Sequence, residues 1–256
     1  MINIFFLLFL ITVAGCDTVE EDPFSFPVRS GTRGSYNIIG EIPVPQGFIR
    51  VTAPNGSFAA WLRAVPLRAD KTIRLYNGLP KSNQSGQFAV IDIPIGNKDL
   101  VQCADAVMRI RAEYLYAQKK YAEIAFMDYN NKWYKWQGVA NRPVFDKYLE
   151  NIFGKCGSAS LEKQLKPVAN FSDIASGDVF VQGGFPGHAM LVMDIAVNDK
   201  GVKIFMLAQG YMPAQDMHVV NNPVSTTLSP WYEVNDTDTI ITPGWRFTRG
   251  HLKKWE

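Results

Sequence analysis

The sequence is poor in the residues that most often carry enzyme chemistry, with 3 cysteines and 3 histidines among 256 residues. These few side chains form no HExxH or CxxC spacing, so we expect no metal site and no cofactor. The formal net charge is +2, and charged residues make up 20% of the chain. This composition provides no basic field that could neutralise phosphates, so nucleic acid is not an expected partner.

Long apolar runs are also scarce, and the notable one lies at the start of the chain. Residues 1–15, MINIFFLLFLITVAG, contain no charged side chain, and their apolar run is too short to span a bilayer as a mature helix. We therefore interpret them as a signal peptide. The small residues before Cys16 resemble a bacterial lipobox, which implies that Cys16 becomes the lipidated first residue. The alternative is an ordinary secretory signal with an incidental cysteine.

The segment 16–47 has acids near its start and then several prolines, with little periodic apolar pattern, so it is typical of a tether. Its acidic run, 17–22, resembles signals that send some Gram-negative lipoproteins to the cell surface, although a solvated charge run would look the same. We expect an exported cell-envelope lipoprotein of the outer membrane or cell surface, held to the membrane by lipid on Cys16. A single domain should occupy residues 48–256.

Within this domain the apolar periodicity changes along the chain. Residues 48–95 favour strands and turns with one short helix near 57–63. A long helical segment follows, from Asp99 to about Lys120, and the later pattern predicts further elements. These are helices at 143–153 and 159–165, then strands at 177–182, 187–197, 202–209 and 245–248. Helices followed by an antiparallel sheet predict an α+β fold.

Cys103 lies in the first turn of the predicted long helix. Asp99 and Gln102 have the spacing of a capping box, which places the helix start just before the cysteine. Unpaired N–H groups and the helix dipole at this position favour a thiolate, so we expect a lowered pKa for the Cys103 thiol. The same N–H groups could stabilise an oxyanion, as acyl transfer requires.

His188 follows a glycine-rich loop and begins a predicted strand. If residues 198–201 form the hairpin loop, Val197 pairs with Val202, and the register places His188 opposite Tyr211 with Gln209 diagonal on the same face. The Gln209 amide oxygen could then accept from one imidazole N–H. That bond would leave the other ring nitrogen free to take the thiol proton.

This order, with a Cys at a helix start, a GDVF strand, a His at the next strand and a polar residue one strand later, resembles the papain-like fold in its NlpC-type cell-wall peptidase version. The resemblance implies Cys103 as nucleophile, His188 as general base and Gln209 as the orienting third residue. Gln is less usual at the third position than His, Asn or Asp. The longer strings QCADAVMRIRAEYLY, GDVFVQGGFPGHAMLV and LAQGYMPAQD resemble an uncharacterised domain-of-unknown-function family of bacterial lipoproteins over about residues 46–250. This match is the closer of the two, and it implies no activity.

Other interpretations of the cysteines and histidines stay open. A single Cys beside an apolar stripe is more often part of a core than a nucleophile. An exported chain could also bridge Cys103 to Cys156, which would abolish the nucleophile, although we expect both to be free thiols. His218 and His251 have no matching partners, so we assign them to the surface or to strands.

Four aromatic or apolar residues are candidates for the walls of a substrate groove. Tyr211 and Met212 follow Gln209 directly, and the predicted register brings them near His188. Trp133 and Trp136 lie in YNNKWYKWQG and could also line a groove, although such a cluster is more often core.

We therefore expect a cysteine hydrolase that acts on an amide or peptide bond, with the cell wall as one candidate source of substrate. The substrate would be a peptide or cell-wall fragment, and the sequence does not indicate an oligomeric state. The alternative is a non-catalytic surface lipoprotein that binds a peptide or glycan in the same groove.

Overall fold

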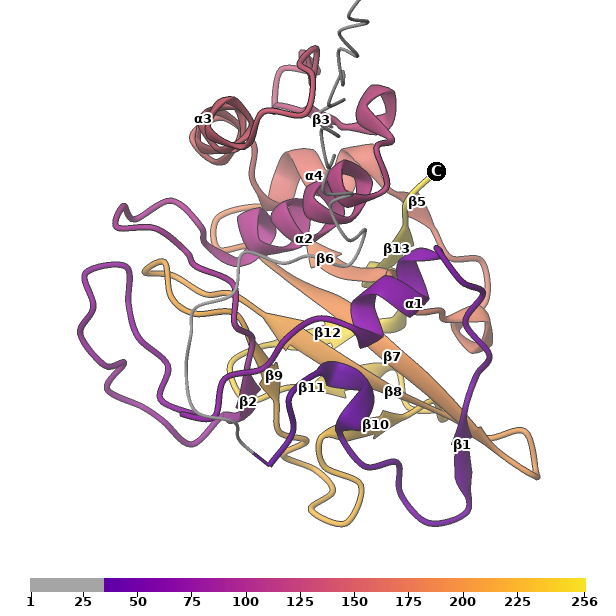
Figure 1. The fold of residues 1–256 in the computed structure, drawn as a ribbon. Coiled ribbons are helices and arrows are strands. Elements are labelled where there is room, and N and C mark those ends of the chain that lie inside the picture. Colours follow the sequence, from indigo (N-terminus) through magenta and orange to yellow (C-terminus); the bar gives the residue numbers. More distant parts are fainter. Residues whose placement is uncertain (1–34) are drawn as a thin grey trace, which may run out of the picture.

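A large antiparallel sheet forms the centre of the molecule, and the helices lie against one of its faces (Figure 1). The computed structural model describes residues 35–256, and every element below belongs to that range. The helices are α1 (Phe58–Arg63), α2 (Cys103–Ala117), α3 (Arg142–Phe153) and α4 (Ser158–Gln164). Short 3-10 helices occur at Ile39–Glu41, Tyr121–Glu123, Phe171–Asp173 and Arg249–His251. The α+β prediction is confirmed.

The main sheet has strands in the order β2-β9-β8-β7-β6-β13-β5, with β1 paired to β7 and β10 paired to β8. Its strands are β1 (Phe48–Arg50), β2 (Gln87–Val90), β5 (Lys166–Pro167), β6 (Val179–Gln182), β7 (His188–Asn198), β8 (Lys203–Gln209), β9 (His218–Val220), β10 (Trp231–Glu233) and β13 (Leu252–Lys254). Two separate hairpins are formed by β3 (Ala125–Met127) with β4 (Trp133–Lys135), and by β11 (Thr239–Ile241) with β12 (Arg246–Thr248). Strands β7 and β8 therefore lie at the centre of the fold.

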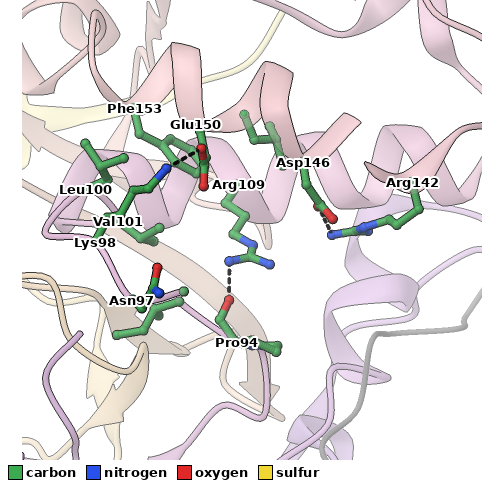
Figure 2. Close-up of a pocket in the computed structure, with 13 residues that line it drawn as sticks. Pro94, Asn97, Lys98, Leu100, Val101, Arg109, Arg142, Asp146, Glu150 and Phe153 are labelled. Atoms are coloured by element: carbon green, nitrogen blue, oxygen red, sulfur yellow. Dashed lines mark hydrogen bonds and ion pairs between the residues drawn. The ribbon is translucent and has the colours of Figure 1, made fainter. Parts of the chain in front are cut away.

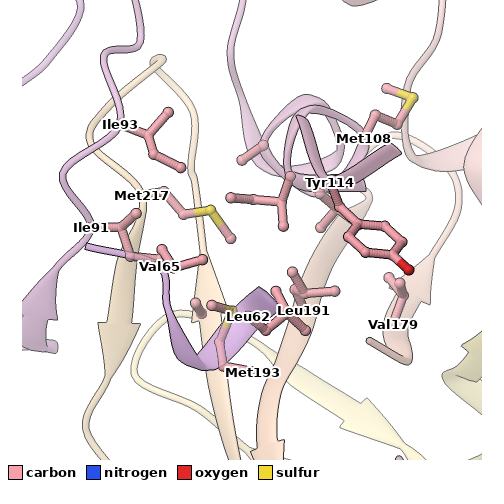
Figure 3. Close-up of a cluster of buried hydrophobic side chains, with 14 of the residues drawn as sticks. Leu62, Val65, Ile91, Ile93, Met108, Tyr114, Val179, Leu191, Met193 and Met217 are labelled. Atoms are coloured by element: carbon pink, nitrogen blue, oxygen red, sulfur yellow. The ribbon is translucent and has the colours of Figure 1, made fainter. Parts of the chain in front are cut away.

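Both faces of β7 and β8 are buried, which explains their nearly continuous apolar sequence. Leu191 and Met193 point to the helical side, where they lie beside Leu62 of α1 in the buried cluster that also includes residues of α2 (Figure 3). Met190 and other apolar residues point to the opposite side, toward the β11–β12 hairpin. Helix α2 is thus fixed against the strand that begins with His188.

The β7–β8 hairpin differs from the predicted register at its loop. Val197 pairs with Lys203, and not with Val202 as predicted. The loop is one residue shorter than expected, because Gly201 takes a left-handed φ of +79° and closes a tight turn after Asn198. A β-bulge between Val192 and Asp194 then shifts the register back, so Leu191 pairs with Ala208. The register shift at the loop and the register shift at the bulge therefore cancel, so the pairing near His188 is the predicted one.

The start of the domain also differs from the prediction. Ile39 and Ile42 are completely buried, and the Ile39 N–H group donates to the Val65 carbonyl at 3.0 Å. Residues 38–42, which the sequence assigned to the tether, are therefore part of the packed domain because their apolar side chains enter its core. The predicted signal peptide, Cys16 and the acidic run at 17–22 lie outside the described residues.

Candidate functional site

Helix α2 begins at Cys103, but its first turn is capped differently from the prediction. The Asp105 Oδ2 atom accepts a hydrogen bond from the Gln102 N–H group at 3.1 Å, so Gln102 and Asp105 form the helix start. Asp99 is not the cap, which corrects the prediction. Its Oδ1 atom instead accepts from the Ala214 N–H group at 2.7 Å and from the Gln102 side-chain amide at 3.0 Å. Asp99 therefore ties the helix start to the segment that follows β8.

The Cys103 thiol is buried, with 9% of the residue exposed. Burial raises the pKa of this thiol, and the nearby Asp105 acts in the same direction. Hydrogen bonding from the backbone of Ala104 and Ala189 lowers the pKa, but less than burial raises it. The lowered pKa expected from the helix start is therefore wrong, because desolvation outweighs the N–H groups. The Ala189 contact places the sulfur beside the residue that follows His188.

His188 is buried at the first position of β7, and its Nε2 atom lies 2.7 Å from the Gln209 Oε1 atom. Burial lowers the pKa of His188 to about 4, while the Gln209 hydrogen bond acts in the opposite direction. The imidazole is therefore neutral near pH 7. Since the Gln209 oxygen can only accept, we assign the Nε2 atom as the protonated nitrogen, and the Nδ1 atom keeps its lone pair.

Aromatic rings enclose the same imidazole. The His188 ring centroid lies 4.9 Å from that of Tyr211 and 5.2 Å from that of Trp245. Phe247 stacks on it with a centroid distance of 5.9 Å. The contact between His188 and Tyr211 is the one that the predicted register implied. Phe247 enters the site from β12, and Trp245 from the residue before that strand. No local sequence pattern connects this hairpin to His188.

Gly210 allows the end of β8 to approach the start of α2. A Cβ atom at this position would lie 2.8 Å from the Gln102 carbonyl oxygen and 2.9 Å from the Ala106 Cβ atom. Neither distance is tolerated by a real side chain, and one of the two opposing atoms belongs to the backbone. The absence of a side chain at Gly210 thus lets the end of β8 lie directly against the first turn of α2.

A cavity of about 500 Å³ opens beside the helix start. Cys103 lines it, and the loop 184–187 and Met212 form part of its wall. Phe185 is fully exposed, and Met212 and Tyr129 are 59% and 64% exposed. The rim of the cavity therefore presents apolar side chains to solvent next to the thiol.

The other predicted groove residues lie elsewhere. Trp136 is buried, and its ring packs edge-on against Phe145 and Tyr148 in the helical core. Trp133 is half exposed on β4 and does not line the cavity beside Cys103. The assignment of Trp136 to a groove is wrong, because its neighbours in α3 complete an aromatic cluster around it.

Cys156 lines the same cavity as Cys103, and both are free thiols. Burial raises the pKa of Cys156 to about 12, and the carboxylates of Asp128 and Asp105 act in the same direction. The cavity thus contains two thiols, of which only Cys103 stands at the start of a helix.

A second cavity, of about 360 Å³, lies between α3 and the segment before α2 (Figure 2). Its cations are already paired: Lys98 contacts Glu150 at 2.8 Å, and Arg142 contacts Asp146 at 2.7 Å. Arg109 donates to the Pro94 carbonyl. These contacts neutralise the lining. Cys103 lines the larger cavity and not this one, and His188 is in the lining of neither, so the cavity beside Cys103 is the better candidate site.

Residues 35–256 lack two features that would indicate other functions. No cluster of three or more His, Cys, Asp or Glu side chains that could hold a metal ion occurs there. No helix in the same range has the length and apolar character needed to cross a bilayer.

Comparison with known protein families identifies the class of this chain. The family described as Domain of unknown function (4846) matches residues 38–143 and 128–254. The matched segments cover most of the chain, including Cys103, His188 and Gln209, so the protein belongs to this family. No curated protein and no solved structure shows significant similarity to it.

Proposed function

We propose that the protein is a papain-like cysteine hydrolase that cleaves an amide or peptide bond. The observation that carries this proposal is the contact between His188 and Gln209, which leaves the His188 Nδ1 atom free to accept a proton. Cys103 supports it as the nucleophile, because its thiol lies at the start of α2 and contacts the Ala189 N–H group. Together the three residues supply a nucleophile, a base and a group that orients the base.

The reaction begins with a neutral thiol and a neutral imidazole. His188 Nδ1 takes the thiol proton as the Cys103 sulfur attacks the carbonyl carbon of the substrate. N–H groups in the first turn of α2 have no partner within the helix, so they can donate to the developing oxyanion. The imidazolium then gives its proton to the leaving amine, and a thioester remains on Cys103. Water, deprotonated by His188, cleaves the thioester and releases a carboxylic acid and the free thiol.

We propose a peptide or cell-wall fragment as the substrate. A peptide bond supplies the carbonyl carbon and the amine leaving group that this chemistry needs. The apolar rim formed by Phe185, Met212 and Tyr129 would pack against an apolar part of such a substrate beside the thiol. The cavity of about 500 Å³ has room for a side chain and part of its backbone.

Selective alkylation tests whether Cys103 is a nucleophile activated by His188. The purified protein is treated with iodoacetamide near pH 7, and labelling of each cysteine is followed by peptide mass spectrometry. We expect fast labelling of Cys103 that falls by about 100-fold in His188→Ala, because a positioned base contributes on this scale. Cys156 is the internal control. It lines the same cavity, but it does not stand at the start of a helix, and no base is proposed for it. Equal slow labelling of the two thiols would refute the proposal.

One observation favours a second candidate function. Burial raises the pKa of the Cys103 thiol, which is unfavourable for a preformed thiolate. A surface lipoprotein that binds a peptide or glycan in this cavity, without cleaving it, would keep such a thiol inert. Slow labelling of Cys103 together with binding of cell-wall peptides to the Cys103→Ala variant would support this alternative.

We also propose that the protein is an exported lipoprotein of the outer membrane or cell surface, anchored through Cys16. The support is the lipobox-like sequence at residues 13–16 and the apolar run before it. Cys16→Ser should move the full-length protein from the membrane fraction to the soluble fraction, or leave it unprocessed, when it is expressed in a bacterium. Unchanged partition into the membrane fraction would contradict this proposal.

A further inference from the structure

A chain of hydrogen bonds leads away from His188 into the interior of the molecule. The Gln209 side chain contacts His188 through its oxygen at 2.7 Å, and its Nε2 atom lies 3.2 Å from the His218 Nε2 atom. The His218 Nδ1 atom lies 2.9 Å from the Asp216 backbone oxygen. His218 stands on β9, directly opposite Gln209 of β8. The side chains of His188, Gln209 and His218, which form this series of hydrogen bonds, are all buried.

The donor and the acceptor of each hydrogen bond in this series can be assigned by starting from the Asp216 backbone oxygen. A carbonyl oxygen can only accept, so the His218 Nδ1 atom is the donor to Asp216. A neutral imidazole then has an acceptor at Nε2, which takes a hydrogen from the Gln209 amide nitrogen. The Gln209 amide is thereby oriented with its oxygen toward His188, and His188 must donate from Nε2. The lone pair of His188 is left on Nδ1, where the proposed reaction needs it.

We infer that His218 is a positioning residue, which acts through Gln209 to hold His188 in the tautomer with a free Nδ1 atom. The catalytic consequence of this inference rests on the proposed function, whereas the tautomers themselves do not. In the proposed reaction His218 acts on His188 only through the Gln209 amide, so it is a positioning residue and not a catalytic one. His218 lies on β9, as one of the two sequence-based expectations had it, but it is buried, so its expected place at the surface is wrong.

The groups around His218 keep it neutral. Burial lowers the pKa of His218 to about 4, and Lys81 and His188 act in the same direction, whereas the hydrogen bond with the Asp216 backbone oxygen raises it by less. The Asp216 carboxylate would oppose this, but its Oδ2 atom is occupied by the Arg68 guanidinium and the Arg74 N–H group, each at 2.7 Å. Of the Asp216 polar atoms, the backbone oxygen is the one that contacts the imidazole. His218 therefore keeps its acceptor at Nε2 across the neutral pH range.

Two variants of His218 distinguish the effect of its hydrogen-bond acceptor from the effect of its side-chain volume. In His218→Gln, the side-chain amide oxygen can take the position of the His218 Nε2 atom. The Gln209 amide nitrogen then still has an acceptor for its hydrogen bond. In His218→Leu, an apolar side chain of similar size leaves the Gln209 amide nitrogen buried without an acceptor, and Gln209 is free to turn over. Thermal unfolding of both variants identifies any general loss of folding.

The primary measurement is nitrogen-15 NMR of the imidazoles in the full-length protein near pH 7. We expect His188 to be protonated at Nε2 and His218 at Nδ1. His218→Leu should shift His188 toward the Nδ1-protonated tautomer, whereas His218→Gln should not. Iodoacetamide labelling of Cys103 should slow by about tenfold in the Leu variant and by less than about threefold in the Gln variant, the scale of one buried hydrogen bond.

The outcomes distinguish this inference from the proposed function. Protonation of His188 at Nδ1 in the unmodified protein would overturn the inference, even if neither variant folds. An unchanged His188 tautomer in folded His218→Leu would overturn it too. If the tautomer changes while Cys103 labelling stays slow and identical in all proteins, the positioning by His218 is supported and the hydrolase proposal fails.

Discussion

The Nε2 atom of His188 and the Oε1 atom of Gln209 are 2.7 Å apart, at the ends of two central strands that pair antiparallel. This contact fixes one face of the imidazole ring. It also gives the two residues different roles in the proposed reaction, because the imidazole of His188 can accept a proton and the amide of Gln209 cannot.

These roles predict a graded effect of substitution. Gln209→Ala should slow iodoacetamide labelling of Cys103 by about tenfold, because the ring loses its orientation but keeps its basic nitrogen. The further loss in His188→Ala should be larger. The double variant should resemble His188→Ala alone, since Gln209 acts only through the ring. Additive losses in the double variant would contradict this assignment.

The reactivity of Cys103 should also depend on pH through His188. Burial lowers the pKa of His188 to about 4 in the folded protein, so the ring loses its function as a base only when it is protonated below that range. The labelling rate should therefore persist from pH 7 down to about pH 5 and then fall. Tryptophan fluorescence recorded over the same range verifies that the protein stays folded. A midpoint near 6.5, the ordinary imidazole value, would show that the ring is solvated.

The parts of the fold that were predictable from sequence are those set by local patterns. The apolar periodicity of 99–120 located α2, although the helix starts at Cys103 and is capped by Gln102 and Asp105. The continuous apolar runs located β6, β7 and β8 within two residues of their observed bounds. Gln209 could be placed near His188 because a single hairpin joins them, and register within a hairpin is a local property.

The parts that escaped prediction depend on contacts between separate elements. β9 has only three residues, and the connection between Gln209 and His218 is not a tight hairpin turn, so the sequence does not determine the register that pairs them. Trp136 was ambiguous for the same reason, since its burial depends on Phe145 and Tyr148 of α3. The raised pKa of Cys103 is likewise a consequence of tertiary burial, which the helix-start argument did not include.

A substitution at Gly210 should affect the site through the backbone, by changing the distance between β8 and α2. In Gly210→Ala the new Cβ atom would lie 2.8 Å from the Gln102 carbonyl oxygen, so the end of β8 and the start of α2 must separate. We expect a loss of stability of about 1–3 kcal/mol, typical of overpacking, and slower labelling of Cys103. Gly250→Ala is the matched control, since its nearest neighbour would be the Thr248 hydroxyl oxygen at 3.7 Å. Equal melting temperatures for the two variants would contradict this close approach.

Asp105 provides the last prediction, because its carboxyl group is buried and only half satisfied. The Oδ2 atom accepts from Gln102, whereas the Oδ1 atom has no hydrogen-bond partner. Burial raises the pKa of Asp105 to about 8, so the carboxyl is protonated in the folded protein near pH 7. In the unfolded chain the same group ionises near its ordinary value of 3.8.

The sign of the pH dependence follows from these two values. Between about pH 4 and 8 the folded protein binds a proton at Asp105 that the unfolded chain releases, so this residue reduces stability as the pH rises. Asp105→Asn keeps an oxygen for the Gln102 N–H group and cannot ionise. The two proteins should be similarly stable near pH 4, and the Asn variant should be more stable by on the order of 4 kcal/mol at pH 7. His188 and His218 contribute the opposite pH dependence, but equally in both proteins, so the difference between their urea unfolding free energies isolates Asp105. A difference that stays constant from pH 4 to pH 8 would show that Asp105 is ionised throughout, and a charged Asp105 would then oppose formation of the Cys103 thiolate directly.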